Sequence, residues 1–193
     1  MKPLVCFTFD KNSSEKCDLW YDVLQEARTG YEGFHMHVFK DYYHNTVKLS
    51  FEEKPFSSHP KHVWAICRYQ GKWLLTEHED RGYEFPGGKV EPNEEADQAA
   101  IREIQEETGA VVRELTYIGQ YQVLGREKII VKNIYFADIE RLVKQDTYFE
   151  TKGPVLFADL PRSIAKNKNF SFIMKDDVLR QSLAYLEKNG LIR

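Results

Sequence analysis

Short apolar runs rich in β-branched and aromatic residues predict a series of β-strands in the middle of the chain. His62 to Tyr69 forms the first run, and Trp73 to Thr76 resumes it after a turn at Gln70-Gly71. This pattern predicts a β-hairpin. Three later segments have the same character, and Gly125-Arg126 separates the last two into a second predicted hairpin: Val111 to Tyr117, Tyr121 to Leu124 and Lys128 to Ala137.

The segment between Asn93 and Gly109 has helical spacing instead. Its interior is rich in strong helix formers, Asn93 is a suitable N-cap, and Gly109 stands where a left-handed C-cap is favoured. Ala96, Ala100 and Ile104 recur four residues apart, so one stripe of the helix can pack on a sheet. The spacing therefore predicts an amphipathic helix of about four turns.

A second helix is predicted near the C-terminus. Leu179, Leu183 and Leu186 recur at helical spacing after a cap at Asp176 or Asp177. Many strands with few helices, and without strict alternation between them, predict an α+β sandwich and not a doubly wound sheet.

Composition and charge narrow the class of protein. The 193 residues include 42% hydrophobic and 13% aromatic residues, enough for one globular domain with a packed core. Lys and Arg number 27 against 30 Asp and Glu, a formal net charge of -3, which argues against a general nucleic-acid-binding surface. The apolar runs are far shorter than the roughly 20 residues that span a bilayer, so we expect no transmembrane segment.

The cysteines and the N-terminal residues indicate a reducing compartment. Cys6, Cys17 and Cys67 are odd in number, far apart, and lack a second cysteine at metal-ligand spacing. The apolar run that follows Met1 is too short for the core of a secretory signal. We therefore expect a cytoplasmic protein with free thiols.

Charge is distributed unusually along the first predicted helix. From Glu94 to Thr108 there are six acidic residues and the single base Arg102. Glu103, Glu106 and Glu107 share one face in the last turns, where the helix dipole is negative, so each like-charge pair costs about 0.2–0.5 kcal/mol. A bound divalent cation would offset this cost, because carboxylates and a backbone carbonyl form the oxygen site that Mg²⁺ or Mn²⁺ accepts. A solvated acidic face is the alternative.

The residues before this helix complete a longer pattern. A strand-like segment ends at Phe85-Pro86 and enters the paired glycines Gly87-Gly88, a turn that can bring backbone groups close to a ligand. From Gly88, five residues lead to Glu94, and seven more lead to "REIQEETGA", which begins at Arg102. The complete pattern resembles the Nudix box, with Ala110 in place of the larger aliphatic residue that usually ends it.

The resemblance to the Nudix family extends beyond the box. "YEFPGGKVE" is similar to the MutT-like branch, and segments such as "MHVFKDYYHNTVKLSF" and "YFETKGPVLF" are similar to one bacterial type of it. The resemblance implies the Nudix fold, a mixed β-sheet between helices, over residues 36–193. Residues 1–35 lie outside it as an N-terminal extension whose role the sequence leaves open.

The resemblance also implies an activity and a cofactor. MutT-like enzymes hydrolyse nucleoside 5′-triphosphates, including 8-oxo-dGTP, to the monophosphate and pyrophosphate with Mg²⁺, for which Mn²⁺ is an alternative. Metal binding is assigned to Glu103, Glu106, Glu107 and the backbone carbonyl of Gly88. Glu103 is at the same time a candidate for the base that deprotonates the attacking water.

Supporting and substrate-binding roles follow in the same way. Arg102 and Glu94 match an ion pair that braces the preceding loop against the helix. Glu150 lies before a predicted strand, where MutT-like enzymes carry an additional metal-binding or catalytic acid. Weaker candidates for that acid are Glu127 and Glu140. Four residues are candidates for substrate contacts, the first two to phosphate and the last two to the base: Lys89, His78, Phe85 and Asn169.

The physiological substrate stays open between two classes. Free nucleoside triphosphates are the first, and 5′-triphosphorylated RNA is the second, because related enzymes act as RNA 5′-pyrophosphohydrolases. Five residues are candidates for a basic strip along an RNA backbone: Lys128, Lys132, Arg162, Lys166 and Lys168. A non-catalytic nucleotide sensor is disfavoured because all three box glutamates are present. We expect no membrane partner, and the oligomeric state stays open.

Overall fold

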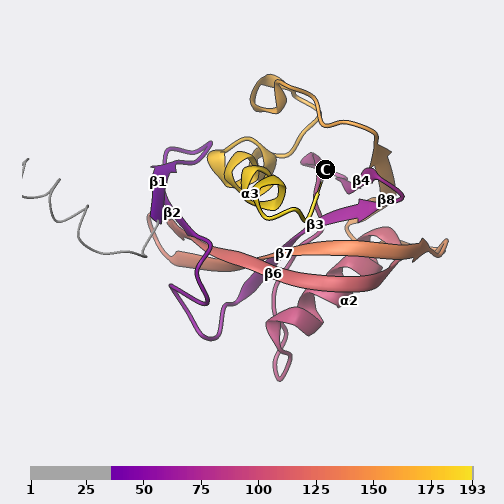
Figure 1. The fold of residues 1–193 in the computed structure, drawn as a ribbon, viewed down its shortest axis with the longest axis horizontal. Helices are drawn as coiled ribbons and strands as arrows, with labels where there is room; N and C mark the ends of the chain where they lie inside the picture. Colours follow the sequence, from indigo (N-terminus) through magenta and orange to yellow (C-terminus); the bar gives the residue numbers. More distant parts are fainter. Residues whose placement is uncertain (1–35, 193) are drawn as a thin grey trace, which may run out of the picture. The chain divides into compact units, whose positions relative to one another are not determined.

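The computed structural model describes residues 36–192 and places them around one mixed β-sheet (Figure 1). The sheet has eight strands in the order β1-β2-β6-β7-β3-β4-β5, and β8 pairs with β4. The strands are β1 (Met36–Lys40), β2 (Thr46–Ser50), β3 (His62–Tyr69), β4 (Lys72–His78), β5 (Gly82–Glu84), β6 (Ala110–Leu124), β7 (Ile129–Leu142) and β8 (Thr151–Phe157). All pairs are antiparallel except β3 with β7, which are parallel. The predicted α+β class is confirmed.

Both predicted hairpins form. β3 and β4 pair around Gln70-Gly71, and both residues have positive φ angles of 50° and 77°. β6 and β7 pair along almost their whole length. The predicted break between Tyr117 and Tyr121 is wrong, because β6 continues through it with a register shift between Tyr117 and Gly119. A β-bulge absorbs the irregularity that looked like a strand boundary in the sequence.

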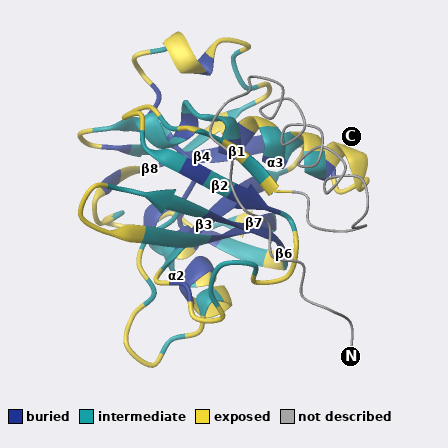
Figure 2. Cartoon of the chain, turned by 90° about the vertical axis from the view of Figure 1, so that its left-hand side faces the viewer, coloured by how far each residue is buried: buried dark blue, intermediate teal, exposed yellow. Residues whose placement is uncertain are grey.

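Two helices cover opposite faces of the sheet, α2 (Ala96–Thr108) and α3 (Asp177–Lys188) (Figure 1). Buried residues concentrate in the central strands, while the connecting loops are exposed (Figure 2). On the α2 side, Ala99, Ala100 and Ile104 are fully buried against β3 and β7 residues. The α3 side holds a larger aromatic core that includes Trp64 and Phe85. Short 3-10 turns, η1 (Ile164–Lys166) and η2 (Phe172–Met174), precede α3.

The ends of the helices follow local chain chemistry. α2 ends at Gly109, which has a φ of 68° and donates its N–H to Gln105 O, as predicted. Its N-cap, however, is Glu95, and the predicted cap Asn93 instead has a left-handed φ of 66° in the preceding loop. The N-cap of α3 is Asp176, whose side chain accepts a hydrogen bond from Val178 N.

Three further predictions concern the N-terminal extension, the cysteines and membrane spans. The extension at residues 1–35, with Cys6 and Cys17, lies outside the described residues. Cys67 is buried and free. In residues 36–192, neither helix is long and apolar enough to cross a membrane.

Candidate active site

The glycine-paired loop between β5 and α2 is fixed to β3 by backbone hydrogen bonds. Ala65 N donates to Pro86 O and Val63 N donates to Gly88 O, each at 2.9 Å. Between them, Gly87 N donates to the carboxylate Oε2 of Glu107 at 3.2 Å. Because successive carbonyls of an extended segment alternate in direction, the carbonyl of Gly87 points away from β3.

This geometry corrects the expectation for Gly88. Its carbonyl faces β3 and accepts the hydrogen bond from Val63, because the loop extends the hydrogen-bonding pattern of that strand. Gly87 is the glycine whose backbone contacts Glu107. Gly88 contributes its lack of a side chain, since a Cβ there would clash with the carboxylate of Glu103.

Glu107 is the most deeply buried of the three box glutamates. Only 7% of the residue is exposed, and its carboxylate accepts from the neutral amide of Gly87. Burial, and then the nearby charges of Glu84 and Glu103, raise its pKa to about 8. A cation brought beside this carboxyl group would lower its pKa and favour its ionised form.

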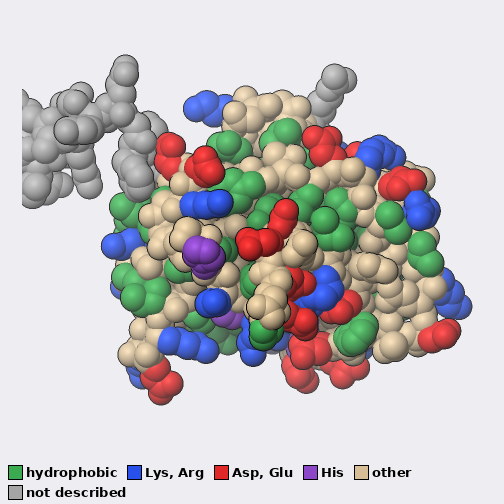
Figure 3. Space-filling model, turned by 90° about the horizontal axis from the view of Figure 1, so that it is seen from below, with side chains coloured by type: hydrophobic (Ala, Val, Ile, Leu, Met, Phe, Trp, Pro, Cys, Tyr) green, Lys and Arg blue, Asp and Glu red, His purple; other side chains and the backbone are tan. Residues whose placement is uncertain are grey.

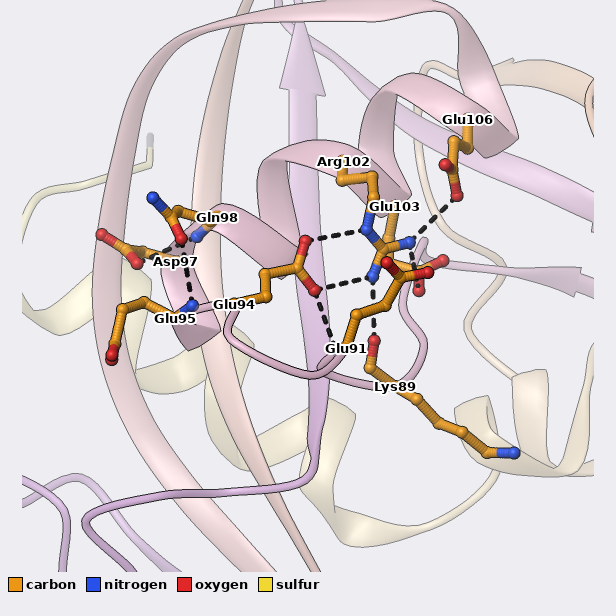
Figure 4. Close-up of polar contacts among 9 residues, drawn as sticks. All are labelled: Lys89, Glu91, Glu94, Glu95, Asp97, Gln98, Arg102, Glu103 and Glu106. Carbon is orange, nitrogen blue, oxygen red and sulfur yellow. Dashed lines mark hydrogen bonds and ion pairs between the residues drawn. The ribbon is translucent and has the colours of Figure 1, made fainter.

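Arg102 organises the other acidic residues of the helix (Figure 4). Its guanidinium binds both carboxylate oxygens of Glu94 at 2.8 and 3.0 Å, and Nη2 also donates to Lys89 O at 2.9 Å. Nη1 lies 3.0 Å from both Glu103 Oε1 and Glu106 Oε2. The hydrogen bonds from Arg102 lower the pKa of Glu94, whereas burial raises the pKa of Glu103. Arg102 and Glu94 thus brace the loop against α2.

The donor set fits a hard divalent cation. Glu103, Glu106 and Glu107 offer carboxylate oxygens on one side of α2, and Gly87 offers a carbonyl turned away from β3. Across residues 36–192, no three acidic, imidazole or thiol groups are already arranged as ligands of one ion. Here Nη1 of Arg102 contacts the carboxylates of Glu103 and Glu106 instead, so metal binding would break these two contacts.

A second group of charges lies at the end of β4, and two of its members, Arg81 and Glu84, were not expected from the sequence. Arg81 binds Glu84 through Nη2 at 2.6 Å and Nε at 3.2 Å, and Glu84 is only 2% exposed. The signal for this pair in the sequence was two oppositely charged residues, three positions apart, just before Gly87-Gly88. Both residues lie close enough to Glu107 to influence its pKa, Glu84 raising it and Arg81 lowering it.

His78 and Glu150 meet in the same region. His78 is 6% exposed, and its Nδ1 accepts hydrogen bonds from the backbone N–H groups of Asp80 and Arg81. Its Nε2 lies 3.9 Å from the carboxylate of the exposed Glu150. His78 therefore caps the turn after β4 and points its other nitrogen toward Glu150. Of the weaker acidic candidates, Glu140 forms an ion pair with Arg141 at 2.8 Å.

The predicted substrate contacts fall in different environments. Phe85 is 1% exposed and packs edge-on against Trp64 and Trp73, so the expectation that it stacks on a base is wrong. Lys89 is exposed, and its side chain extends away from Glu103 and Glu106 (Figure 4). The exposed Asn169 binds Tyr83 N through its backbone carbonyl at 2.7 Å, which leaves its side-chain role a prediction.

Three lysines lie near His62, the first residue of β3. Lys89, Lys128 and Lys132 all lie near enough to His62 to lower its pKa, which burial and these charges bring to about 4. Viewed from the α2 side, the surface carries grouped Asp and Glu side chains next to Lys, Arg and His side chains (Figure 3). Of the predicted basic strip, Lys128 is exposed near His62 together with Lys89, whereas desolvation by burial lowers the pKa of Lys132.

The two glycines of the loop should respond differently to alanine. A Cβ on Gly87 would lie 2.5 Å from Val63 O and 2.9 Å from Trp64 Cα, which are backbone atoms of a central strand. We expect Gly87→Ala to lower the free energy of unfolding by about 2 kcal/mol in urea titrations. Gly88→Ala meets only the carboxylate end of the Glu103 side chain, which can rotate away, so it should leave stability within about 1 kcal/mol but lower kcat about 10-fold or more. Equal effects on stability would contradict this assignment.

Comparison with known proteins identifies relatives. The NUDIX domain model matches residues 58–152. YtkD of Bacillus subtilis strain 168, which carries the name of an 8-oxo-dGTP diphosphatase, is 69% identical over 157 residues, covering 81% of this chain and 99% of YtkD. The crystal structure of a mutant of the Bacillus subtilis pyrophosphohydrolase BsRppH superimposes with a TM-score of 0.81 at 68% identity, covering 82% of this chain and all of that one. A Nudix hydrolase from Nitrosomonas europaea, 19% identical with a TM-score of 0.55, shares the fold.

Proposed function

Because the chain belongs to the Nudix family of pyrophosphohydrolases, which act on acid anhydrides, we propose that it hydrolyses nucleoside 5′-triphosphates, 8-oxo-dGTP among them, to the monophosphate and pyrophosphate. The observation that carries the proposal is that Glu107 and Glu103 both approach the Gly87-Gly88 loop, with Glu106 held beside Glu103 by Arg102 on the same side of α2. The high identity to YtkD supports the substrate class. We expect it to act in the cytoplasm, where such nucleotides are found.

We propose Mg²⁺ as the cofactor, with Mn²⁺ as a substitute. The metal would be held by Glu106, Glu107 and the Gly87 carbonyl. Glu103 would either join these ligands or act as the base that deprotonates the attacking water. When bound, the metal neutralises charge on the phosphate oxygens and lowers the pKa of water.

The other polar residues have positioning roles in this proposal. Arg102 and Glu94 hold the loop between β5 and α2 in place against the helix. Arg81 presents a guanidinium, one-third exposed, that can bind a phosphate oxygen while Glu84 orients it. Glu150 is free to approach the water or a metal, since its carboxylate is exposed and only loosely held by His78.

The bond that breaks can be identified with labelled water. As in MutT-like enzymes, we expect attack at the β-phosphorus, so hydrolysis in H₂¹⁸O should place the heavy oxygen in pyrophosphate. Mass spectrometry of both products checks this. Label in the monophosphate would show attack at the α-phosphorus and would overturn the proposed route.

A second candidate substrate is 5′-triphosphorylated RNA. The observation that favours it is that two exposed lysines, Lys89 and Lys128, lie near His62, which pairs with Lys89 in the loop before α2. Pyrophosphate release from 8-oxo-dGTP, dGTP, GTP and a short triphosphorylated RNA, at matched concentrations, separates the two. A higher kcat/KM for free nucleotides supports nucleotide-pool hydrolysis, and a higher value for RNA supports 5′-end processing.

A further inference from the structure

Two tyrosines project from the loop between β1 and β2. Tyr42 and Tyr43 are 53% and 59% exposed, although tyrosines usually bury much of their ring. Their rings meet edge to face, with 5.2 Å between centroids. Two residues from the segment before α3 join them: Phe172 lies 5.0 Å from Tyr43, and Lys175 Nζ lies 5.3 Å from the centre of Tyr42. We call Tyr42, Tyr43, Phe172 and Lys175 the tyrosine platform.

The loop that carries the platform is held in one conformation. Asp41 Oδ1 accepts from Tyr43 N at 2.9 Å and from Asn45 N at 2.8 Å, and Oδ2 accepts from Asn45 Nδ2 at 3.0 Å. His44 takes a left-handed φ of 63° and donates its N–H to Asp41 O. The carboxylate of Asp41 is therefore occupied within the loop, and both rings are presented without a large ordering cost on binding.

The chemistry of the platform fits single-stranded nucleic acid. Exposed aromatic rings stack on bases of any sequence, and a lysine beside them can contact the backbone phosphate. A free mononucleotide has a single base, attached next to the triphosphate that the box glutamates would hold. A polymer is needed to reach a second stacking surface.

The platform is joined to the catalytic region through the segment before α3. Tyr83 N donates to Asn169 O at 2.7 Å, and Ser171 N donates to Tyr83 O at 3.0 Å, so the residues just before Phe172 are bonded to β5. β5 ends at Glu84 and leads directly into the Gly87-Gly88 loop that Glu107 contacts. The chain that carries Phe172 and Lys175 therefore starts beside the strand that positions the catalytic loop.

We propose that the tyrosine platform binds the body of a 5′-triphosphorylated RNA, stacking a base downstream of the end held at the box glutamates. The proposal rests on the second of the two candidate substrates. It assigns to the β1–β2 loop a selectivity for polymer over free nucleotide, which the catalytic carboxylates cannot supply because both substrates present the same triphosphate.

The test compares the full-length protein with the double variant Tyr42→Ala/Tyr43→Ala. Hydrolysis of GTP and of triphosphorylated RNAs of two and eight nucleotides is followed by pyrophosphate release. We expect the variant to lose about 10-fold in kcat/KM on the eight-nucleotide RNA, with GTP unchanged within about twofold. The matched control Tyr42→Phe/Tyr43→Phe keeps both rings and should retain wild-type values on all substrates. Fluorescence anisotropy with a labelled 5′-hydroxyl eight-nucleotide RNA measures binding without catalysis. The wild type and the phenylalanine variant should bind this RNA more tightly than the alanine variant.

The outcomes distinguish the proposal from the proposed function. If wild-type protein hydrolyses the triphosphates and the alanine variant shows the same RNA-to-GTP ratio, the platform proposal is overturned while the enzymatic function stands. An equal loss on GTP and RNA would also overturn it, since the loop would then support the fold or another contact. If the wild type hydrolyses neither substrate, the proposed function fails, and the anisotropy measurement still decides whether the platform binds RNA.

Discussion

Replacement of Glu107 by glutamine is expected to lower kcat for nucleoside triphosphate hydrolysis at least about 10³-fold, or about 4 kcal/mol of transition-state stabilisation. Glutamine keeps the size of the side chain and can still accept from Gly87 N, so the loop should stay in place. The carboxylate charge that holds the cation is lost. Steady-state pyrophosphate release with saturating Mg²⁺ measures the change.

The matched control is Glu114→Gln, a glutamate on the exposed part of β6. It removes the same charge from the protein and should leave kcat unchanged within about twofold. Isothermal titration of Mn²⁺ gives a second readout, because Glu107→Gln should also weaken metal binding. Wild-type turnover by Glu107→Gln, at any Mg²⁺ concentration, would remove Glu107 from the catalytic group.

Without metal, the protein should become less stable as pH rises from about 5 to 8. The pKa of Glu107 is about 8 in the folded protein against an ordinary value of 4.5, so in this window the folded state holds a proton that the unfolded state has lost. Stability is then greatest below the unfolded pKa and falls by at most about 1.4 kcal/mol per pH unit for this group. Urea unfolding in EDTA at several pH values measures the slope.

The variant Glu107→Gln isolates the contribution of this carboxyl group. Asp176, whose burial raises its pKa to about 7, adds a slope of the same sign, so the wild-type slope alone does not assign the effect. Glu107→Gln should flatten the curve and make the metal-free protein more stable than the wild type at pH 8. Saturating Mg²⁺ should stabilise the wild type and have little effect on the variant. An unchanged slope in the variant would show that Glu107 is already ionised in the folded protein.

Local patterns predicted the elements that carry the site. α2 was predicted because its helix formers, its buried Ala and Ile stripe and its Gly109 cap are all encoded within a short segment. The acids on the last turns stood out because they oppose the helix dipole. The continuous strand β6 was missed because the bulge at Gly119 is accommodated by pairing with β7, which the local sequence does not specify.

Details that depend on distant contacts were not predicted. Phe85 looked available for stacking, but its burial is set by Trp64 and Trp73 from other strands. Whether Gly87 or Gly88 turns its carbonyl to β3 depends on the register with Val63 and Ala65. The sharing of Arg102 by Glu94, Glu103 and Glu106 is a matter of side-chain conformation, which the spacing of residues along the helix leaves undetermined.

The C-terminal end of α2 is tied to two strands through its last carbonyl groups. The hydroxyls of Thr76 on β4 and Thr151 on β8 both donate to Glu107 O, at 3.1 and 3.0 Å, and Gln145 Nε2 donates to Gln105 O at 2.9 Å. Helix ends usually fray because such carbonyls lack partners within the helix. Here the last turn cannot unwind without breaking contacts to the sheet, so the box glutamates belong to the same cooperative unfolding unit as β4 and β8. Thermal fluctuations that open the exposed loops would therefore leave the spacing of these carboxylates unchanged until the sheet itself unfolds.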